Sequence, residues 1–382
     1  MRSRRGFLKA VLGPAFAGGS VIDQALFRAV RARAQSNYQL PELFDIEKIA
    51  DGIYAALARP QTLLNSNAVI FENAEDLLIM DSHSKPSAVA SLVRQVRNMG
   101  ISKPVRYVVS SHFHWDHAQG LPAYRRIAPR ADIVSSETTR KLIGQETVPR
   151  LKESFTQLEK SVESYKKLAA DAKSPQDKAV HQRMLRETQD YLREMKEFRP
   201  ELPNLTFERD LILHDKAHDL HLAFRGRGHT SGDVVVFCPA KKTVATGDLL
   251  HGFFPFIGDG YPHDWPRTLL HVAEFDFAHI AGGHGGVFHS KDRAYQMGNY
   301  IEELTEAVVR ARRGGKPLEA VQAEIKPASL KTLADGGYAE RTAEAILKYR
   351  MLPPPLPAHE QVIADSVKTN IEHIYKALER SA

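Results

Sequence analysis

The stretch HFHWDHAQG places three histidines and one aspartate within six consecutive positions, directly after an apolar, strand-like run. His112 and His114 alternate, so both side chains can project the same way from a strand end. Asp116 and His117 lie one turn farther on and can face a second ion beside the first. Packing gives no reason for this cluster, because each buried imidazole needs its own hydrogen-bond partner. The residue types favour a divalent metal such as zinc, which binds imidazole nitrogen together with carboxylate oxygen.

Further candidate ligands follow later strand-like runs. His229 comes after HLAFRGR, Asp248 after KTVA and His284 after FAHIA. Glycines flank all three, and they let the backbone turn tightly and bring a side chain close to its neighbours. Upstream, Asp81 closes the run LLIM. Any one of these residues would ordinarily be a structural loop residue, but so many at successive strand ends predict a shared metal site.

The elements that must position these residues alternate between short strands and helices. Residues 65–84 predict two strands joined by a turn at residues 72–76, and residues 86–100 have helical spacing that ends at a glycine. Residues 104–112 and 131–136 have the composition of buried strands. This order predicts an α/β layered domain.

Two regions depart from the alternation. Residues 142–200 are charged with helical spacing, interrupted at Ser174-Pro175, and they predict a helical hairpin inserted into the domain. A solvated arm, a lid over the site and a homodimer contact are the alternatives for its role. Helical patterns resume at Asp292 and predict a helical C-terminal extension over residues 301–382.

The N-terminus resembles a twin-arginine export signal, with SRRGFLK at residues 3–9. We therefore predict that residues 1–34 are a signal peptide and that the protein is periplasmic or secreted; a basic amphipathic helix is the alternative. These 34 residues hold seven Lys/Arg and one acid, which accounts for the whole formal charge of +6. The near-neutral remainder argues against nucleic acid as a partner, and no other stretch is apolar enough for stable membrane insertion.

The order of these motifs resembles the metallo-β-lactamase fold superfamily, whose five motifs occur in order across residues 54–289. The resemblance implies an αββα sandwich over residues 35–300, with a dinuclear site at one edge of its two sheets. By this resemblance, one metal is bound by His112, His114 and His229. The other is bound by Asp116, His117 and His284, and Asp248 bridges the two. Asp81 is expected to orient a ligand or its loop. The implied cofactor is two Zn²⁺ per chain, with iron or manganese as alternatives.

Such a centre implies hydrolysis. Two cations that share a hydroxide lower the pKa of water toward ~7, and this bridging hydroxide would attack an ester, thioester, lactone or amide carbonyl of a small-molecule substrate. Asp116 and Asp248 are the expected catalytic residues, and Asp116 can also orient the water or accept its proton. Asp248 is more typical of the glyoxalase-II-like branch, because true β-lactamases of this fold lack the bridging aspartate.

Two other functions are compatible with the motifs. One is an exported metal-binding accessory protein to a periplasmic redox system, and the other is a relative of the mononuclear-iron persulfide dioxygenases. Aromatic and histidine residues near the motifs are candidates for substrate contact: Trp115, His251, Phe253, Phe254 and Tyr261. Core packing is the alternative for Trp115, and packing on the C-terminal helices is the alternative for the aromatic loop.

Overall fold

The computed structural model describes residues 41–334 and 337–380. Within them, seven strands form one mixed sheet in which chain order is also spatial order. They are β1 (Phe44–Ala50), β2 (Ile53–Ala58), β3 (Ala68–Glu72), β4 (Leu77–Met80), β5 (Val105–Val109), β6 (Asp132–Ser136) and β7 (Leu205–Phe207). A second mixed sheet has the spatial order β13 (Val287–Phe288), β12 (His279–Gly282), β11 (Thr243–Gly247), β10 (Val234–Cys238), β9 (Leu220–Phe224) and β8 (Asp210–Leu213).

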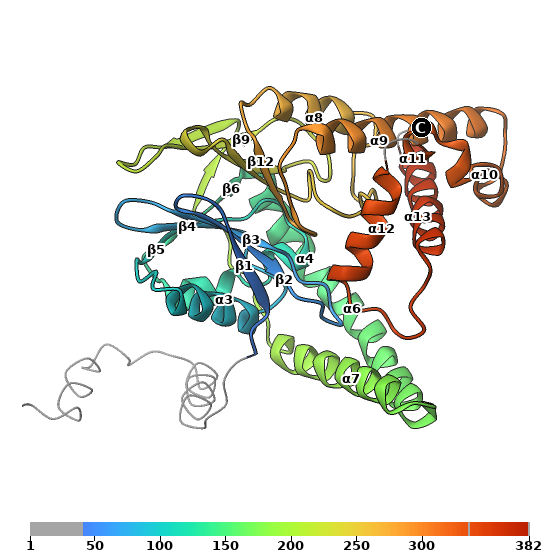
Figure 1. Cartoon of the computed structure of the whole chain (residues 1–382), viewed down its shortest axis with the longest axis horizontal. Helices are drawn as coiled ribbons and strands as arrows, with labels where there is room; N and C mark the ends of the chain where they lie inside the picture. Colours follow the sequence, from blue (N-terminus) through green and yellow to red (C-terminus); the bar gives the residue numbers. More distant parts are fainter. Residues whose placement is uncertain (1–40, 335–336, 381–382) are drawn as a thin grey trace, which may run out of the picture. The chain divides into compact units, whose positions relative to one another are not determined.

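Helices cover the outer face of each sheet (Figure 1). Against the first sheet lie α3 (Pro86–Asn98) and α5 (Leu121–Ile127), and the short α4 (Trp115–Ala118) precedes α5. Against the second lie α8 (Trp265–Ala273) and α9 (Asp292–Arg313), followed by the C-terminal helices α10 (Leu318–Glu324), α11 (Lys331–Ala334), α12 (Tyr338–Tyr349) and α13 (His359–Arg380).

The alternation of side chains along the strands builds the layers. Ile70 of β3 packs with Leu92 of α3 on the outer face of the first sheet. Its neighbour Phe71 points the other way, into a core shared with Leu222 and Val236 of the second sheet. Because side chains alternate between the two faces of a strand, such apolar strands bury both faces at once. The predicted α/β sandwich of two sheets with helices on the outer faces is therefore confirmed.

Parallel strand pairs bring the ends of distant segments together. β4 is parallel to β5, and β11 is parallel to β12. Asp81 directly follows β4 and Asp248 directly follows β11, while His112 and His284 lie shortly after the ends of β5 and β12. Since the carboxyl ends of parallel strands meet at one edge of a sheet, each pair delivers two of the predicted site residues to the same place.

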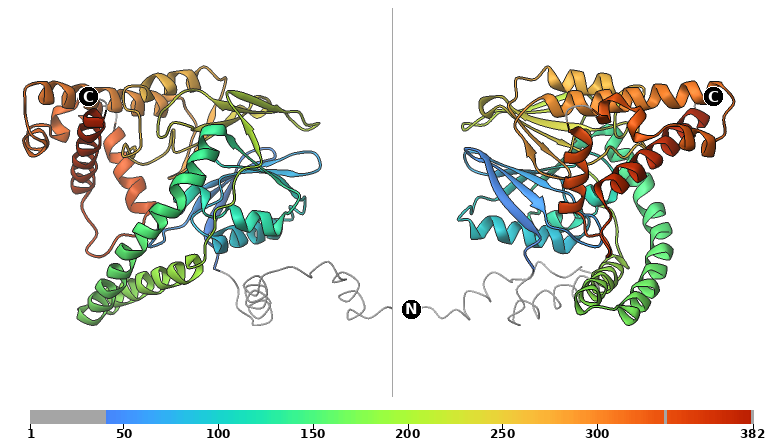
Figure 2. Two further views of the ribbon diagram at one scale, coloured as in Figure 1. Left: turned by 180° about the vertical axis from the view of Figure 1, so that it is seen from behind. Right: turned by 45° about the vertical axis from the view of Figure 1, so that its right-hand side comes forward.

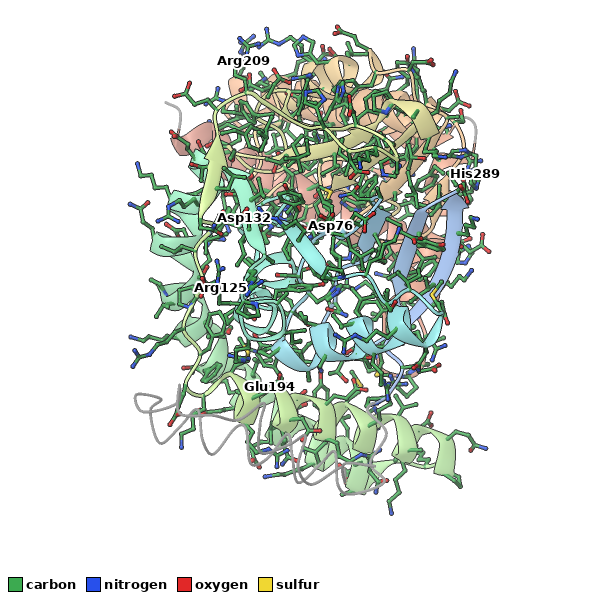
Figure 3. The ribbon with its side chains drawn as sticks, turned by 90° about the vertical axis from the view of Figure 1, so that its left-hand side faces the viewer. Asp76, Arg125, Asp132, Glu194, Arg209 and His289 are labelled. Carbon is green, nitrogen blue, oxygen red and sulfur yellow. The ribbon has the colours of Figure 1, made fainter. Side chains whose placement is uncertain are left out.

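The predicted helical insertion is a hairpin of α6 (Glu137–Asp171) and α7 (Pro175–Met195), which Figure 2 shows running out from the sheets and back. α6 starts five residues before the expected position because the Ser136 hydroxyl caps it, accepting a hydrogen bond from the amide of Thr139. The carboxylate of Glu194 on α7 accepts hydrogen bonds from the amide and hydroxyl of Ser87 at the start of α3 (Figure 3). Glu187 accepts from Thr62 in the same way. These contacts anchor the hairpin at its base, against the body of the fold.

The C-terminal helices continue the second core. Val235 and Phe237 of β10 share one apolar cluster with Tyr300 and Leu304 of α9. The boundary predicted at residue 300 falls inside α9, which runs unbroken through it. The predicted signal peptide lies outside the described residues. Among the residues that are described, no helix has both the length and the apolar character needed to cross a bilayer.

Candidate metal centre

A first cluster consists of three histidines. His112 and His114 lie in the loop between β5 and α4, and His229 lies in the loop between β9 and β10. The His114 Nδ1 lies 2.8 Å from the His229 Nε2, and the ring of His112 lies 4.6 Å from that of His229 between centroids. Each residue offers one nitrogen within 4.8 Å of the others. His112 and His229 are buried and His114 is half-buried, so water has little access to this cluster. Three imidazoles in this arrangement can hold one divalent cation.

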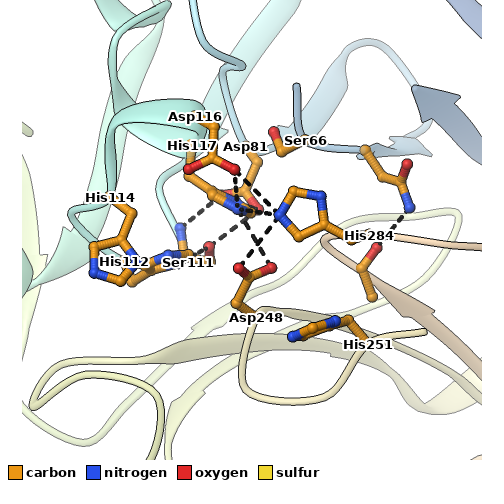
Figure 4. Close-up of polar contacts among 12 residues, drawn as sticks. Ser66, Asp81, Ser111, His112, His114, Asp116, His117, Asp248, His251 and His284 are labelled. Carbon is orange, nitrogen blue, oxygen red and sulfur yellow. Dashed lines mark hydrogen bonds and ion pairs between the residues drawn. The ribbon is translucent and has the colours of Figure 1, made fainter. Parts of the chain in front are cut away.

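A second cluster lies beside the first (Figure 4). The His284 Nε2 is 3.1 Å from the Asp116 Oδ2 and 3.4 Å from the His117 Nε2. The Asp248 carboxylate touches both clusters, since its Oδ2 lies 3.3 Å from His284 Nε2 and 3.7 Å from His229 Nε2. Its Oδ1 lies 3.3 Å from His117 Nε2. The structure thus brings together all seven predicted ligands, with Asp248 between the two groups.

Asp81 and Ser111 fix which nitrogens of two histidines face inward. The Asp81 carboxylate accepts hydrogen bonds from the Ser111 amide at 2.8 Å and from the His117 Nδ1 at 2.8 Å. The Ser111 hydroxyl donates to Asp81 and accepts from the His112 Nδ1 at 2.9 Å. With hydrogen on Nδ1, both imidazoles turn Nε2, the nitrogen that can bind a cation, toward the centre. Asp81 holds this position with a left-handed backbone, at φ 72°, a conformation that aspartate tolerates better than most residues.

The donor set fits divalent cations. Among the described residues, the buried His112 Nε2 has no hydrogen-bond partner, and a lone pair left so is costly unless a cation accepts it. Burial alone would lower the pKa of His117, but the carboxylates of Asp248, Asp81 and Asp116 raise it well above its usual value. Burial likewise opposes the charged form of His284, yet Asp248 and Asp116 raise its pKa to about 9. The carboxylates therefore stabilise positive charge at the centre. Two metal ions would supply that charge.

Comparison with known proteins agrees with this geometry. The family model described as "Metallo-beta-lactamase superfamily" matches residues 64–295, more than half of the chain and a span that holds every candidate ligand. The chain belongs to the metallo-beta-lactamase superfamily. A solved structure, the metallo-beta-lactamase from Pontibacter korlensis, is similar at 17% identity and a TM-score of 0.47, over 67% of this chain and 98% of that one.

Two residues that sequence reasoning missed connect the inserted hairpin to this metallo-beta-lactamase-type site. The Asp259 carboxylate accepts a hydrogen bond from the His114 Nε2 at 2.9 Å. Arg150 of α6 donates two hydrogen bonds to the same carboxylate, at 2.7 and 2.9 Å. Burial would raise the pKa of Asp259, but the hydrogen bonds from His114 and Arg150 lower it well below its usual value. Asp259 therefore stays ionised and holds the His114 Nε2, so that the Nδ1 of this ring faces His229.

Replacing Asp259 with alanine should weaken metal binding at the first cluster by about 10- to 100-fold, the usual cost of losing a carboxylate that orients a histidine ligand. Competition with a chromophoric chelator measures the affinity. Asp264→Ala is the matched control, because Asp264 pairs with Arg227 in the same loop region without touching a candidate ligand. Wild-type affinity in Asp259→Ala would show that His114 needs no such support.

The five predicted substrate contacts lie in different surroundings. Trp115 packs on Tyr191 of α7, with ring centroids 6.2 Å apart. Phe254 is buried among the C-terminal helices against Tyr300 and Tyr338. These placements match the packing alternatives, and a role in substrate contact stays a prediction for both residues.

The other three lie closer to the clusters or at the surface. Phe253 stacks on His284 at 5.4 Å. Burial lowers the pKa of His251 to about 3, and its Nδ1 accepts a hydrogen bond from the Phe253 amide, which leaves the proton on Nε2. Tyr261 lies half-buried under the guanidinium of Arg227. Their contact with substrate also stays a prediction.

One aromatic side chain of the same loop was not predicted. Phe256 is 46% exposed, and its ring lies 5.9 Å from that of His114 and 5.0 Å from that of His373 on α13. Its carbonyl accepts a hydrogen bond from the His229 Nδ1 at 3.2 Å. Phe256 therefore both orients a candidate ligand and offers an apolar surface beside the first cluster.

Acid should destabilise the protein partly through His83, which lies two residues after Asp81. Burial lowers the pKa of this fully buried imidazole to about 3, whereas the unfolded chain takes up the proton near pH 6.5. Stability contributed by neutral His83 is thus complete above pH 6.5 and is lost as the pH falls toward 3, by up to about 1.4 kcal/mol per pH unit.

Urea denaturation of chelator-treated protein between pH 4 and pH 7 checks this expectation. The unfolding free energy of His83→Gln should fall less steeply as the pH is lowered. Between pH 4 and pH 6, its slope should correspond to the uptake of about one proton fewer on unfolding. Chelator in every sample removes the separate effect of metal release at low pH. An identical slope in the two proteins would exclude His83 as a source of the acid sensitivity.

Proposed function

We propose that this protein is a metal-dependent hydrolase with two divalent cations, zinc foremost, that cleaves an ester, thioester, lactone or amide. The observation that carries the proposal is the position of Asp248, within 3.7 Å of candidate ligands from both clusters. A carboxylate shared in this way suits two neighbouring cations better than one.

The bound cations would supply Lewis acidity and lower the pKa of a water molecule, so that a nucleophile forms at neutral pH. The chain's own residues would do the rest. His112, His114 and His229 would hold one cation, and Asp116, His117 and His284 the other. Asp81 and Asp259 would keep the inward nitrogens unprotonated. Burial would raise the pKa of Asp116, but His117 and His284 lower it, so its ionised carboxylate can also accept a hydrogen bond from the attacking water.

The proposal also includes export of the protein from the cytoplasm. The twin-arginine-like residues 3–9 and the near-neutral charge of the rest of the chain support a periplasmic or secreted hydrolase of small molecules. The exposed, charged faces of α6 and α7 would be available for a homodimer contact. The anchored base of the hairpin supports a fixed wall of the site rather than a swinging lid.

The test is turnover by zinc-loaded protein on a panel of esters, thioesters, lactones and cephalosporins. We expect hydrolysis of at least one class, its loss with chelator and its return with added zinc. Zinc-loaded protein that turns over none of these classes, yet co-purifies with a stable partner, would contradict the proposal and favour an accessory protein.

A further inference from the structure

Two further histidines face each other outside the metal centre, at the edge of the second sheet. His279 begins β12, and His289 directly follows β13. Because Ile280 pairs with Phe288 in this antiparallel strand pair, the two histidines lie opposite each other. Their Nδ1 atoms are 2.8 Å apart, and their rings are nearly perpendicular, at 83°. Neither histidine belongs to the clusters of the centre.

The backbone holds both histidines in place. The His279 amide donates a hydrogen bond to the Lys242 carbonyl at 3.0 Å, and β12 is also paired with β11. Two residues after His289, the Lys291 ammonium donates to two backbone carbonyls at the end of α8, at 2.6 Å each. The Lys242 ammonium pairs with Asp276 at 3.0 Å. Two ligands anchored in this way lose little conformational freedom when an ion binds between them.

The separation of the two Nδ1 atoms suits an ion bound by both. In the first cluster of the centre, the His114 Nδ1 and the His229 Nε2 are also 2.8 Å apart. With metal–nitrogen bonds of about 2.0 Å, two nitrogens at a right angle around one ion lie about 2.8 Å apart, and two at the tetrahedral angle about 3.3 Å. The right angle is that of square-planar or tetragonal copper(II) and nickel(II), whereas zinc prefers the tetrahedral angle.

The His279 ring can offer a lone pair at neutral pH. Burial lowers its pKa, and the repulsion that a charged His289 would exert lowers it further, so the neutral form predominates at pH 7. In the hydrogen bond that joins the two rings, one Nδ1 carries the proton and the other accepts it. An ion between the rings would bind both Nδ1 lone pairs, and the proton of the donating ring would move to its Nε2.

We propose that His279 and His289 form a second, peripheral metal site, which binds one copper(II) ion, with nickel(II) next in affinity. Of the first-row divalent ions, copper(II) binds nitrogen ligands most tightly, and it favours the angle that these two nitrogens offer. His289 is exposed, at the outer edge of the molecule in Figure 3, so a hydrated ion can reach the pair and keep water as its other ligands. Zinc should bind here more weakly and be removed by dialysis.

A bound ion would link two strands that carry a ligand of the centre between them. The loop from β12 to β13 contains His284, which lies five residues from each of the two histidines. β13 is a two-residue strand at the edge of its sheet. Copper bound by His279 and His289 would therefore hold this short edge strand against β12. The peripheral site is independent of the proposed hydrolysis.

Equilibrium dialysis of zinc-loaded protein against Cu²⁺, with both metals then measured, tests the site. Protein freed of excess zinc should bind one copper ion per chain in addition to its zinc. His279→Gln and His289→Gln should each bind copper at least about 10-fold more weakly, because each variant leaves one ligand in place of two. His214→Gln is the matched control and should bind copper as the wild type does. It also removes an exposed imidazole, but one that pairs with Asp219 rather than with a second histidine.

Two spectroscopic readouts accompany the dialysis. The electron paramagnetic resonance spectrum of copper-loaded wild-type protein should be that of tetragonal copper(II) split by two nitrogens, and this measurement does not depend on the folding of any variant. Amides of residues 279–289 should exchange hydrogen more slowly with copper bound in the wild type, and at an unchanged rate in His289→Gln.

Three results would overturn the site. One is wild-type protein that binds copper only in exchange for zinc of the centre. Another is His289→Gln that keeps wild-type copper affinity, which would leave an ordinary hydrogen bond between two imidazoles. The third is zinc bound by the pair more tightly than copper, which would overturn the assigned metal.

Discussion

Replacing Asp248 with alanine should abolish hydrolysis and release at least one cation. Its two carboxylate oxygens lie 3.3 Å from His117 and His284 and 3.7 Å from His229, so its loss removes a contact with both clusters at once. Loss of a carboxylate that only orients a ligand costs about 10- to 100-fold. The loss of a shared ligand should therefore lower kcat/KM by more than about 100-fold.

Metal content and kcat/KM of purified Asp248→Ala check this result. Asp276→Ala serves as the control, because it removes an exposed carboxylate that pairs with Lys242 far from any candidate ligand. If Asp248→Ala retained both cations and its activity, the two clusters would be independent of this carboxylate, and the proposed shared centre would be wrong.

The second large effect is expected from a single added methyl group, in Gly283→Ala. A Cβ at this position would collide with the Asp248 Oδ1 and lie 2.6 Å from the His117 Cε1. Both side chains belong to the centre and are buried, so they cannot move aside without losing their alignment. Overpacking of this kind costs typically 1–3 kcal/mol, and we expect metal affinity to fall by at least about 10-fold.

Gly144→Ala provides the comparison. Gly144 lies within the first third of α6, and its Cβ would make ordinary contact with Leu202, at 3.6 Å. Alanine is the better helix former by about 1 kcal/mol, so this variant should be as stable as the parent or slightly more so. Thermal unfolding with and without zinc separates the two effects. If zinc stabilises Gly283→Ala against thermal unfolding as much as it stabilises the parent, the centre has room to adjust.

The sequence was sufficient to predict the layers and the candidate ligands because both depend on short-range patterns. The continuous apolar runs of β3 and β4, each bounded by turns, mark buried strands. The ligand spacing from His112 to His117 is local as well. Asp248 directly follows an apolar strand, and His229 and His284 lie within five residues of the ends of theirs. Parallel pairing of β4 with β5 and of β11 with β12 then brings the ends of these strands together.

Contacts between segments far apart in the chain could not be predicted. Asp259 is 145 residues from His114, and Arg150 is 109 residues from Asp259. No spacing rule connects a charged helical insertion to a loop aspartate, so the sequence left the role of α6 open between a solvated arm, a lid and a homodimer contact. The aromatic loop was ambiguous for the same reason. Phe254 and Phe256 look alike in sequence, but the C-terminal helices bury the first and leave the second 46% exposed.

The account depends most on the number of cations that the chain holds. Metal analysis of protein purified without added chelator, then dialysed against zinc, measures this number directly. We predict two zinc ions per chain in the wild-type protein. Protein that holds no metal would contradict the whole account of the centre, and a single iron per chain with oxygen uptake in the presence of a persulfide would replace hydrolysis with sulfur oxidation.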